Sequence, residues 1–159
     1  QEVDLNQVVG EAVELVAYSL RVDGVAVTLD LDPALPPIWG DPHQLHQVVV
    51  NLVTNAHHAM RETPPQRRLA LTTRAQGGGQ RLRLEVADSG PGIPAEIRER
   101  IFEPFFTMKE GGTGLGLCIA AQIMARHGGR LELESSVPQG AIFAVWIPVQ
   151  SGDGQDSRR

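Results

Sequence analysis

Residues 41–60 read DPHQLHQVVVNLVTNAHHAM, and this stretch decides the fold class. Asp41 can cap the free N–H groups of a helix, Pro42 fits the first turn, and Gln44 can reach back as in a capping box. Apolar side chains then recur at helical spacing, so we predict a helix that runs to about Met60. Its core-facing residues form one stripe: Leu45, Val48, Val49, Leu52, Val53, Ala56 and Met60.

The same predicted helix carries a polar stripe. Asn51 and Asn55 are four residues apart and His58 follows three later, so the three side chains share one face. A solvated helix face is the simpler explanation of this stripe. The alternative is a binding site, because an asparagine carbonyl is a hard neutral oxygen that suits Mg²⁺, which takes only one or two protein ligands. These residues alone leave both interpretations open.

On either side of residues 41–60, helices and strands are interspersed. Further helices are predicted at residues 4–20, 95–101 and 115–126. Strands are predicted at residues 25–31, 69–75, 81–87, 130–135 and 141–149. Strands joined by short turns form antiparallel hairpins, which implies a mixed, mostly antiparallel sheet. We therefore expect an α/β protein in which this sheet packs on three main helices as a two-layer sandwich.

The composition limits the class of protein. With 159 residues, 42% hydrophobic and 21% charged, the chain suits one domain, which we place at residues 1–149 before a disordered polar tail at 150–159. A net charge of −5 gives no positive field for nucleic acid or an anionic membrane, and no apolar run approaches the roughly 18 residues of a membrane span. The single cysteine, Cys118, fits a reducing, cytoplasmic compartment. Because the chain opens at Gln1 and close to a predicted helix, we expect it to be part of a longer protein, whether or not that protein is anchored in a membrane.

The stretch DSGPGI, residues 88–93, ends the predicted strand at 81–87. By itself, an Asp-x-Gly-x-Gly segment is more often a turn than a site. Here Asp88 stands at the mouth of the sheet, where Gly90 and Gly92 let a flat ligand approach the backbone. An ionised carboxylate only accepts hydrogen bonds, so it would bind the amino group of adenine and repel the carbonyl oxygen of guanine. One such charge-assisted bond gives a roughly ten- to hundredfold preference.

The stretch GGTGLGL, residues 111–117, leads into the predicted helix at 115–126. A glycine-rich loop before a helix offers unpaired N–H groups and the positive end of the helix dipole, which suits phosphate. The loop matches neither GxxxxGK[ST] nor GxGxxG, so alone it is weak evidence. Lys109, the only lysine beside 13 arginines, stands a few positions upstream on a loop that we expect to be mobile.

Together these stretches resemble the catalytic, ATP-binding domain of bacterial two-component sensor histidine kinases, within the Bergerat-fold superfamily. The asparagine box is QVVVNLVTNA, the first glycine box DSGPGI, the phenylalanine box IFEPFFT and the second glycine box GTGLGL. The flanks WGDPHQLHQ, HGGRLELES and QGAIFAVWIP match too, so the resemblance spans nearly all of residues 2–149. The stretch FFTMKEGGTGLGL is similar to the nitrogen-sensor and dicarboxylate-sensor branch.

The resemblance implies a role for each matching residue. Asn55 would coordinate the Mg²⁺ that bridges the ATP phosphates, and Asn51 would orient the reacting groups near the γ-phosphate. Asp88 would bind the adenine amino group, and Lys109 would reach a phosphate from a flexible lid. Further nucleotide contacts would come from Gly90, Gly92, Ile93, Phe102, Gly112, Thr113, Gly114, Leu115, Gly116 and His58. The phenylalanine box, with Phe102, Phe105 and Phe106, would link the lid to the nucleotide and to the dimerisation helices.

Two positions bear on the chemistry. Several relatives carry a basic and an aromatic residue where this chain has His58 and Ala59, so an aromatic stack on adenine is absent at that point. His58 is then either a phosphate ligand or an exposed residue at the rim of the pocket. At position 51, related gyrase, mismatch-repair and chaperone ATPases have a glutamate that acts as a base for water. Asparagine cannot accept that proton, so Asn51 favours phosphoryl transfer to a histidine over hydrolysis.

The resemblance also implies partners. None of the five histidines has the sequence context of the family's phosphoacceptor, so that histidine would lie on a separate dimerisation domain, which passes the phosphoryl group to a response regulator. His127 is expected to be structural at a helix end. We expect no nucleic-acid partner and no direct membrane insertion of this chain. A Bergerat-fold ATPase, an anti-sigma-type serine kinase and a non-enzymatic adaptor are the alternatives.

Overall fold

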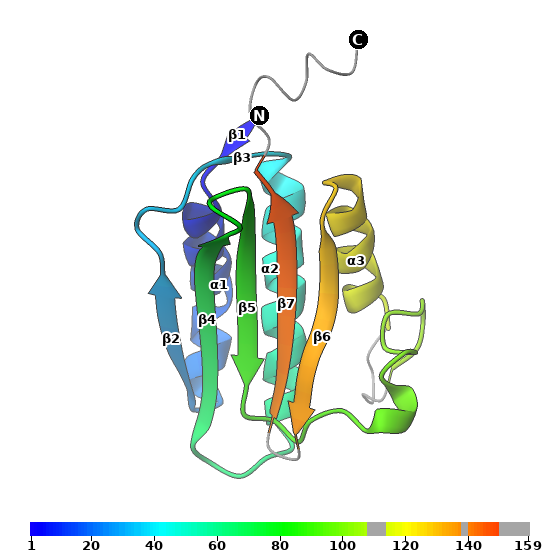
Figure 1. Cartoon of the computed structure of the whole chain (residues 1–159). Coiled ribbons are helices and arrows are strands. Elements are labelled where there is room, and N and C mark those ends of the chain that lie inside the picture. Colours follow the sequence, from blue (N-terminus) through cyan, green and yellow to red (C-terminus); the bar gives the residue numbers. More distant parts are fainter. Residues whose placement is uncertain (108–113, 138–139, 150–159) are drawn as a thin grey trace.

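The computed structural model describes residues 1–107, 114–137 and 140–149, and Figure 1 shows their arrangement. The helices are α1 (Leu5–Val22), α2 (Pro42–Met60) and α3 (Gly116–Arg126), with a 3₁₀ turn, η1 (Ala95–Ile97). The strands are β1 (Glu2–Val3), β2 (Val25–Leu31), β3 (Ile38–Trp39), β4 (Arg67–Gln76), β5 (Arg81–Asp88), β6 (Arg130–Val137) and β7 (Gly140–Pro148). The tail predicted at residues 150–159 lies outside the described residues, so its disorder stays a prediction.

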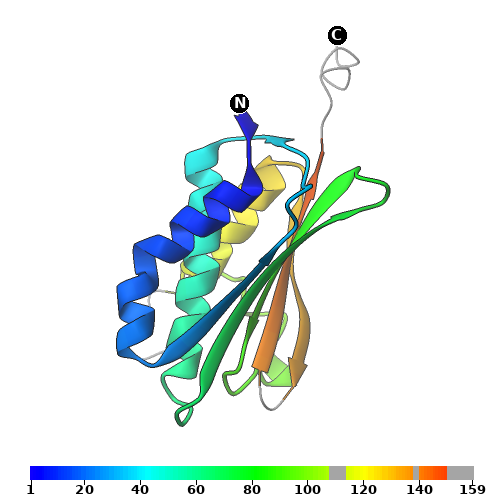
Figure 2. The same ribbon diagram turned by 90° about the vertical axis from the view of Figure 1, so that its left-hand side faces the viewer.

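The long strands form a five-stranded sheet in the order β2-β4-β5-β7-β6. Strands β2 and β4 are parallel, and the other neighbours are antiparallel. Helices α1, α2 and α3 all lie on one face of the sheet, as the turned view in Figure 2 shows. The predicted two-layer α/β sandwich, with a mixed and mostly antiparallel sheet, is confirmed.

The two long helices begin at the capping residues that the sequence provides. Asp4 accepts hydrogen bonds from two N–H groups in the first turn of α1, and Asp41 does the same for α2. After α1, Gly24 turns the chain toward β2 with a φ of +68°, which glycine adopts without a steric penalty. Helix α2 begins directly after Asp41 and ends at Met60, as its sequence pattern predicts.

His127 joins the end of α3 to the start of α2. Its Nε2 accepts a hydrogen bond from the N–H of Asp41 at 3.0 Å, while its Nδ1 lies 2.8 Å from the carbonyl oxygen of Ile123. Gly40 leaves room for the ring, because a Cβ at that position would lie 2.6 Å from it. The structural role predicted for His127 is confirmed by these contacts.

Helix α2 lies at the centre of the core and packs against both α1 and α3. All the core residues predicted for α2 are buried. They pack within one apolar cluster that includes side chains from the inner face of the sheet: Leu69, Leu71, Leu82, Leu84, Val86, Phe143, Val145 and Ile147. Burial of this apolar surface is the main stabilising term of the fold. None of the helices in the described part of the chain has the length and apolarity that crossing a bilayer requires.

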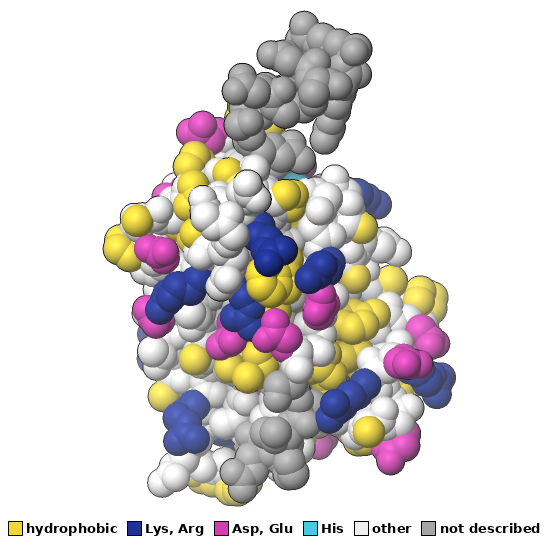
Figure 3. Space-filling model, in the orientation of Figure 1, with side chains coloured by type: hydrophobic (Ala, Val, Ile, Leu, Met, Phe, Trp, Pro, Cys, Tyr) yellow, Lys and Arg dark blue, Asp and Glu magenta, His cyan; other side chains and the backbone are white. Residues whose placement is uncertain are grey.

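The outer face of the sheet is charged, with basic and acidic side chains gathered near its centre in Figure 3. The guanidinium groups of Arg81, Arg83 and Arg130 lie 5.0, 5.5 and 5.6 Å from the centroid of the Trp146 ring. Arg83 also forms ion pairs with glutamates on β5 and β6. These cation–π contacts and ion pairs connect β5, β7 and β6 across the surface.

Two details of the fold differ from the prediction. The helix predicted at 95–101 is only the 3₁₀ turn η1, and the bonds around it, such as Ile97 N–H to Pro94 and Arg100 N–H to Ile97, reach back three residues instead of four. Strands β1 and β3, which pair with each other, were not predicted, because two residues are too few to show an alternating pattern.

Candidate functional site

A cavity of about 330 Å³ opens between α2, the end of β5 and the start of α3. Its volume lies within the range of small-molecule sites. Five stretches of chain line it: α2, the segment that follows β5, the residues from η1 to Thr107, the start of α3, and β7. The site therefore draws on residues from most of the domain.

Helix α2 supplies the polar wall of the cavity. Asn51, Asn55 and His58 all line it, together with Thr54 on the same helix and Glu62 just beyond its end. Asn51, Asn55 and His58 follow one another at four and three residues, and Thr54 lies three residues after Asn51, which is the spacing of one helix face. The predicted polar stripe is thus a cavity wall and not only a solvated surface.

The end of β5 supplies Asp88. The backbone N–H of Gly90 donates a hydrogen bond to Asp88 Oδ1 at 2.8 Å, which orients the carboxylate. A Cβ at Gly90 would lie 2.9 Å from that oxygen and 3.2 Å from the Cβ of Ala59 on α2, so only glycine fits here without displacing a neighbour. Gly90 therefore shapes the site from behind, while Gly92 lines the cavity itself.

The start of α3 closes the site from the other side. Gly114, Gly116 and Leu117 line the cavity. Gly114 has a φ of +73°, and a Cβ there would lie 2.5 Å from a backbone atom of Phe105. Leu115 occupies the N-cap position of α3, and a leucine side chain cannot accept a hydrogen bond from the first turn. The positive end of this helix therefore lies at the cavity, and the side chain of Leu115 does not cap it.

The Asn51 amide links α2 to α3. Its Nδ2 donates to the carbonyl oxygen of Gly116 at 2.9 Å, and its Oδ1 accepts from Nε2 of Gln47 at 2.5 Å. Gln47 lies one turn earlier on α2 and does not itself line the cavity. Its hydrogen bond to Asn51 is a feature of the site that the sequence did not predict.

The floor of the cavity is apolar. It is formed by Ile93, Ile97, Ile101, Phe106, Ala141 and Phe143. Phe102 was predicted to contact the ligand, but it packs behind this floor, edge-on to Phe143 with ring centroids 6.3 Å apart. Phe105 is 74% exposed. The three phenylalanines of residues 101–107 therefore differ: Phe106 lines the cavity, Phe102 packs on Phe143 and Phe105 faces solvent.

Not all of the predicted site residues line the cavity. Gly90 and Leu115 adjoin the cavity, but neither lines it. Lys109, Gly112 and Thr113 lie outside the described residues, so their proposed contacts stay predictions. Apart from Phe102, the other predicted residues line the cavity: Asn51, Asn55, His58, Asp88, Gly92, Ile93, Gly114 and Gly116.

The charges of the lining constrain the ligand. Of the described residues, the lining includes the carboxylates Asp88 and Glu62 and the imidazole of His58, but neither lysine nor arginine. Within residues 1–107, 114–137 and 140–149, no three His, Cys, Asp or Glu side chains gather into a group that could hold a metal ion. A metal ion here would need oxygen atoms of a bound small molecule in addition to the amide of Asn55. Mg²⁺ is commonly bound in this way beside phosphates.

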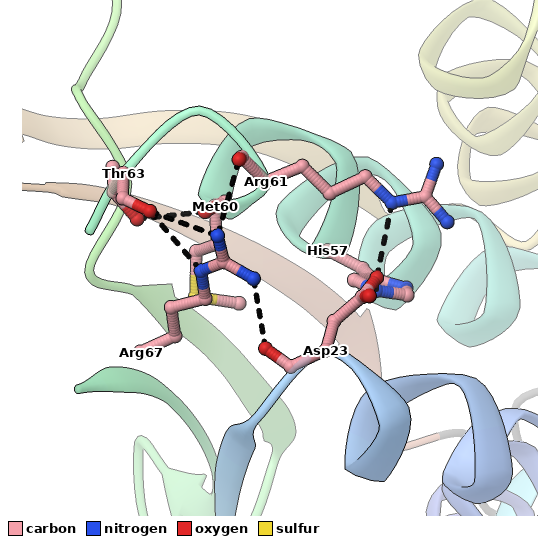
Figure 4. A network of polar contacts seen from close by, with 6 residues as sticks. All are labelled: Asp23, His57, Met60, Arg61, Thr63 and Arg67. Carbon is pink, nitrogen blue, oxygen red and sulfur yellow. Dashed lines mark hydrogen bonds and ion pairs between the residues drawn. The ribbon is translucent and has the colours of Figure 1, made fainter. Parts of the chain in front are cut away.

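A second polar cluster lies behind α2 and is shown in Figure 4. We call it the Asp23 cluster; it consists of Asp23, His57, Arg61 and Arg67. Asp23 Oδ2 lies 2.6 Å from Nε2 of the buried His57 and accepts from Nε of Arg61 at 3.1 Å. The hydrogen bonds from His57 and then from Arg61 lower the pKa of Asp23 below its usual value, against the opposing effect of burial.

Arg67 completes the Asp23 cluster through backbone carbonyls. Its guanidinium donates to the carbonyl oxygens of Asp23 at 2.8 Å, Arg61 at 3.1 Å and Thr63 at 2.9 Å. One side chain thus bridges the end of α1, the end of α2 and the loop before β4, as Figure 4 shows. None of these four cluster residues lines the cavity.

The profile of one protein family matches residues 40–151, and that family is described as "Histidine kinase-, DNA gyrase B-, and HSP90-like ATPase". Sensor histidine kinase ZraS of Klebsiella oxytoca is 38% identical over 158 residues, which cover 99% of this chain and 33% of that protein. Sensory histidine kinase/phosphatase NtrB of Rhodobacter capsulatus is 45% identical over 131 residues, which cover 76% of this chain and 36% of that protein. The chain thus spans about a third of the length of these relatives.

Solved structures share the fold. The catalytic domain of histidine kinase ThkA aligns with a TM-score of 0.80 and 33% identity, over 93% of this chain and 94% of that chain. In another structure, ThkA is in complex with response regulator protein TrrA. That kinase aligns with a TM-score of 0.79 and 29% identity, over 94% of this chain and 42% of that chain.

Proposed function

The chain belongs to the family of histidine kinase-, DNA gyrase B- and HSP90-like ATPases, and from this premise we propose that it is the ATP-binding catalytic domain of a sensor histidine kinase. The domain occupies residues 1–149, and it transfers the γ-phosphoryl group of ATP to a histidine on a dimerisation domain elsewhere in the parent protein. One observation carries the proposal. Asparagines from α2, the carboxylate of Asp88 and the glycines at the start of α3 converge on one cavity of suitable size.

The adenine end of ATP is assigned to the β5 side of the cavity. Asp88, held by the Gly90 N–H, accepts a hydrogen bond from the adenine amino group. The apolar floor, with Ile93 and Phe143, contacts the faces and edges of the base. Ala59 brings no ring to stack on adenine, so recognition depends more strongly on Asp88.

The phosphate end is assigned to the space between α2 and α3. Asn55 would provide an amide oxygen for Mg²⁺ beside the phosphates. When bound, Mg²⁺ would neutralise part of the negative charge of the phosphates, which the acidic side chains of the lining cannot do. The N–H groups at the start of α3 bind phosphate oxygens, and Lys109 adds a positive charge from the segment before it.

The absence of a carboxylate at position 51 favours histidine as the acceptor. In the alternative ATPase, a base must remove a proton from water, and an amide cannot do so. An imidazole nitrogen is already nucleophilic and needs only to be aligned with the γ-phosphorus. Asn51 lines the cavity and can orient the reacting groups without taking a proton. ThkA, whose catalytic domain has the same fold, forms a complex with a response regulator, which supports such a regulator as the downstream partner here.

The test is a transfer assay with three readouts. The chain is mixed with ATP labelled at the γ-phosphate, Mg²⁺ and the dimerisation domain of its own parent protein. We expect acid-labile phosphohistidine on that domain, and Asn55→Ala should abolish it while Gln80→Ala, a change at an exposed turn, should not. Binding of ATP without phosphohistidine would contradict the proposal.

The same assay separates the alternatives. Steady release of phosphate without the dimerisation domain, abolished by Asn55→Ala, would identify an ATPase instead. Acid-stable phosphoserine on a partner protein would identify a serine kinase. Failure of the folded chain to bind ATP at all would leave the non-enzymatic adaptor as the remaining alternative.

A further inference from the structure

The amide of Asn51 is held in one orientation by its two partners. The carbonyl oxygen of Gly116 can only accept a hydrogen bond, so the Nδ2 of Asn51 must face it, at 2.9 Å. The Oδ1 of Asn51 then faces the other way, toward Gln47, whose Nε2 donates to it at 2.5 Å. The direction of both hydrogen bonds is therefore fixed: Gln47 donates to Asn51, and Asn51 donates to Gly116.

This chain of bonds anchors the start of α3. Leu115 at the N-cap cannot hold the first turn with its side chain, and Gly114 and Gly116 on either side have no side chains to pack. The bond from Asn51 therefore ties the first residue of α3 to α2. Because Gly114 and Gly116 both line the cavity, the position of this turn sets the position of its N–H groups in the site.

We propose that Gln47 is a positioning residue, which acts through Asn51 to hold the N-terminus of α3 where it receives the phosphate groups of the nucleotide. The proposal rests on the proposed function, because it assumes that a nucleotide occupies the cavity. Gln47 is exposed and lies outside the lining, so it acts through Asn51 and not by contact with the ligand.

Two substitutions of Gln47 separate orientation from simple contact. Gln47→Ala removes the donor but leaves Asn51 able to face Gly116. Gln47→Glu replaces the donor with a carboxylate, which can only accept, so a glutamate in contact with Asn51 would draw the Nδ2 of Asn51 toward position 47. Its Oδ1 would then face the carbonyl oxygen of Gly116, two acceptors in contact, and the bond between α2 and α3 would be lost. Gln47→Glu should therefore be the more damaging change.

The readout is the affinity for ATP compared with that for adenosine, measured by calorimetry. For Gln47→Glu we expect ATP to bind about tenfold more weakly, with adenosine affinity and melting temperature unchanged. For Gln47→Ala we expect a loss of roughly threefold for ATP alone. Amide hydrogen exchange at Ile119, whose N–H donates to the carbonyl oxygen of Leu115 at 2.9 Å across the first turn of α3, should be faster in both variants.

Controls make each outcome decisive. Gln44→Glu places the same charge one turn earlier on α2, and it should leave ATP affinity as in the wild type. Equal losses for ATP and adenosine, a loss in Gln44→Glu equal to that in Gln47→Glu, or unchanged ATP binding in Gln47→Glu would overturn the positioning role. If the wild-type chain does not bind ATP, the proposed function fails and this inference fails with it, whereas the other outcomes leave the proposed function intact.

Discussion

The last turn of α2 carries two adjacent histidines that belong to different regions of the molecule. His57 is 5% exposed and bonds to Asp23, in the cluster that ties the end of α1 to the end of α2. His58 lies on the neighbouring face and lines the cavity. Their rings are in edge contact, with centroids 6.3 Å apart, so the two regions meet at this point.

The two regions differ in where their polar groups are directed. In the Asp23 cluster, charges and carbonyls face each other: Arg67 covers three carbonyl oxygens, and Asp23 lies between His57 and Arg61. In the cavity, the side chains of Asn55 and Asp88 are directed to a space large enough for a ligand. Polar groups that satisfy one another stabilise the fold, whereas polar groups placed around a cavity can bind. Substitutions should therefore separate stability from binding.

The largest effect is expected from Asp88→Asn. An amide at this position can turn a donor toward the adenine amino group, so ATP affinity should fall about ten- to hundredfold and the preference for ATP over GTP should decrease. The free energy of unfolding should change little, because Asn can still accept the bond from the Gly90 N–H. Calorimetric titration with both nucleotides and urea unfolding measure the two quantities.

Glu62→Gln is the matched control for Asp88→Asn. It also removes one negative charge from the lining, but from just beyond the end of α2 and not from β5. ATP affinity should stay within about threefold of the wild type or rise slightly, because a polyanion loses a repulsive neighbour. If both variants weakened ATP equally, Asp88 would act only through its charge and not as a specific acceptor.

Much of the cavity wall could be predicted because it lies on one helix. The spacing of Asn51, Asn55 and His58 gives one face of α2, and the same spacing would also have indicated Thr54. Asp88 was predictable because it ends an alternating strand at a glycine turn. These features depend on residues close together in sequence.

The rest of the site depends on contacts that a local pattern does not reveal. Ala141 and Phe143 line the cavity because β7 pairs with β5, which places Ala141 opposite Asp88. Gln47 shares the polar face of α2, but its role depends on the carbonyl oxygen of Gly116, which the packing of α3 brings near. Phe102 does not line the cavity, and its edge contact with Phe143 depends on the packing of β7, which a local pattern does not show. The Asp23 cluster was missed because its members come from three separate elements.

A smaller effect, on stability alone, is expected from Arg67→Lys in the Asp23 cluster. A single ammonium group cannot reach the carbonyl oxygens of Asp23, Arg61 and Thr63 together, so the free energy of unfolding should fall by about 1–2 kcal/mol. ATP affinity should not change. The neighbouring exposed Arg68→Lys is the control and should leave both quantities as in the wild type. A loss of ATP binding in folded Arg67→Lys protein would show that the cluster supports the cavity as well as the fold.

The smallest effect, and one that depends on pH, is expected from Asp23→Asn. Contacts with His57 and Arg61 lower the pKa of Asp23 from 3.8, so the carboxylate is stabilised in the folded state relative to the unfolded state. That contribution is complete above the unfolded value and is lost as the pH falls through the lower, folded value. Urea unfolding should therefore show wild type and Asp23→Asn differing most near neutral pH and converging below about pH 4.

Asp30→Asn, which breaks an ion pair whose side chains are 62% and 44% exposed, should give a smaller difference at neutral pH because solvent screens that pair. If Asp23→Asn were as mild as Asp30→Asn at neutral pH, the Asp23 cluster would be a surface ion pair and not the polar connection between α1 and α2.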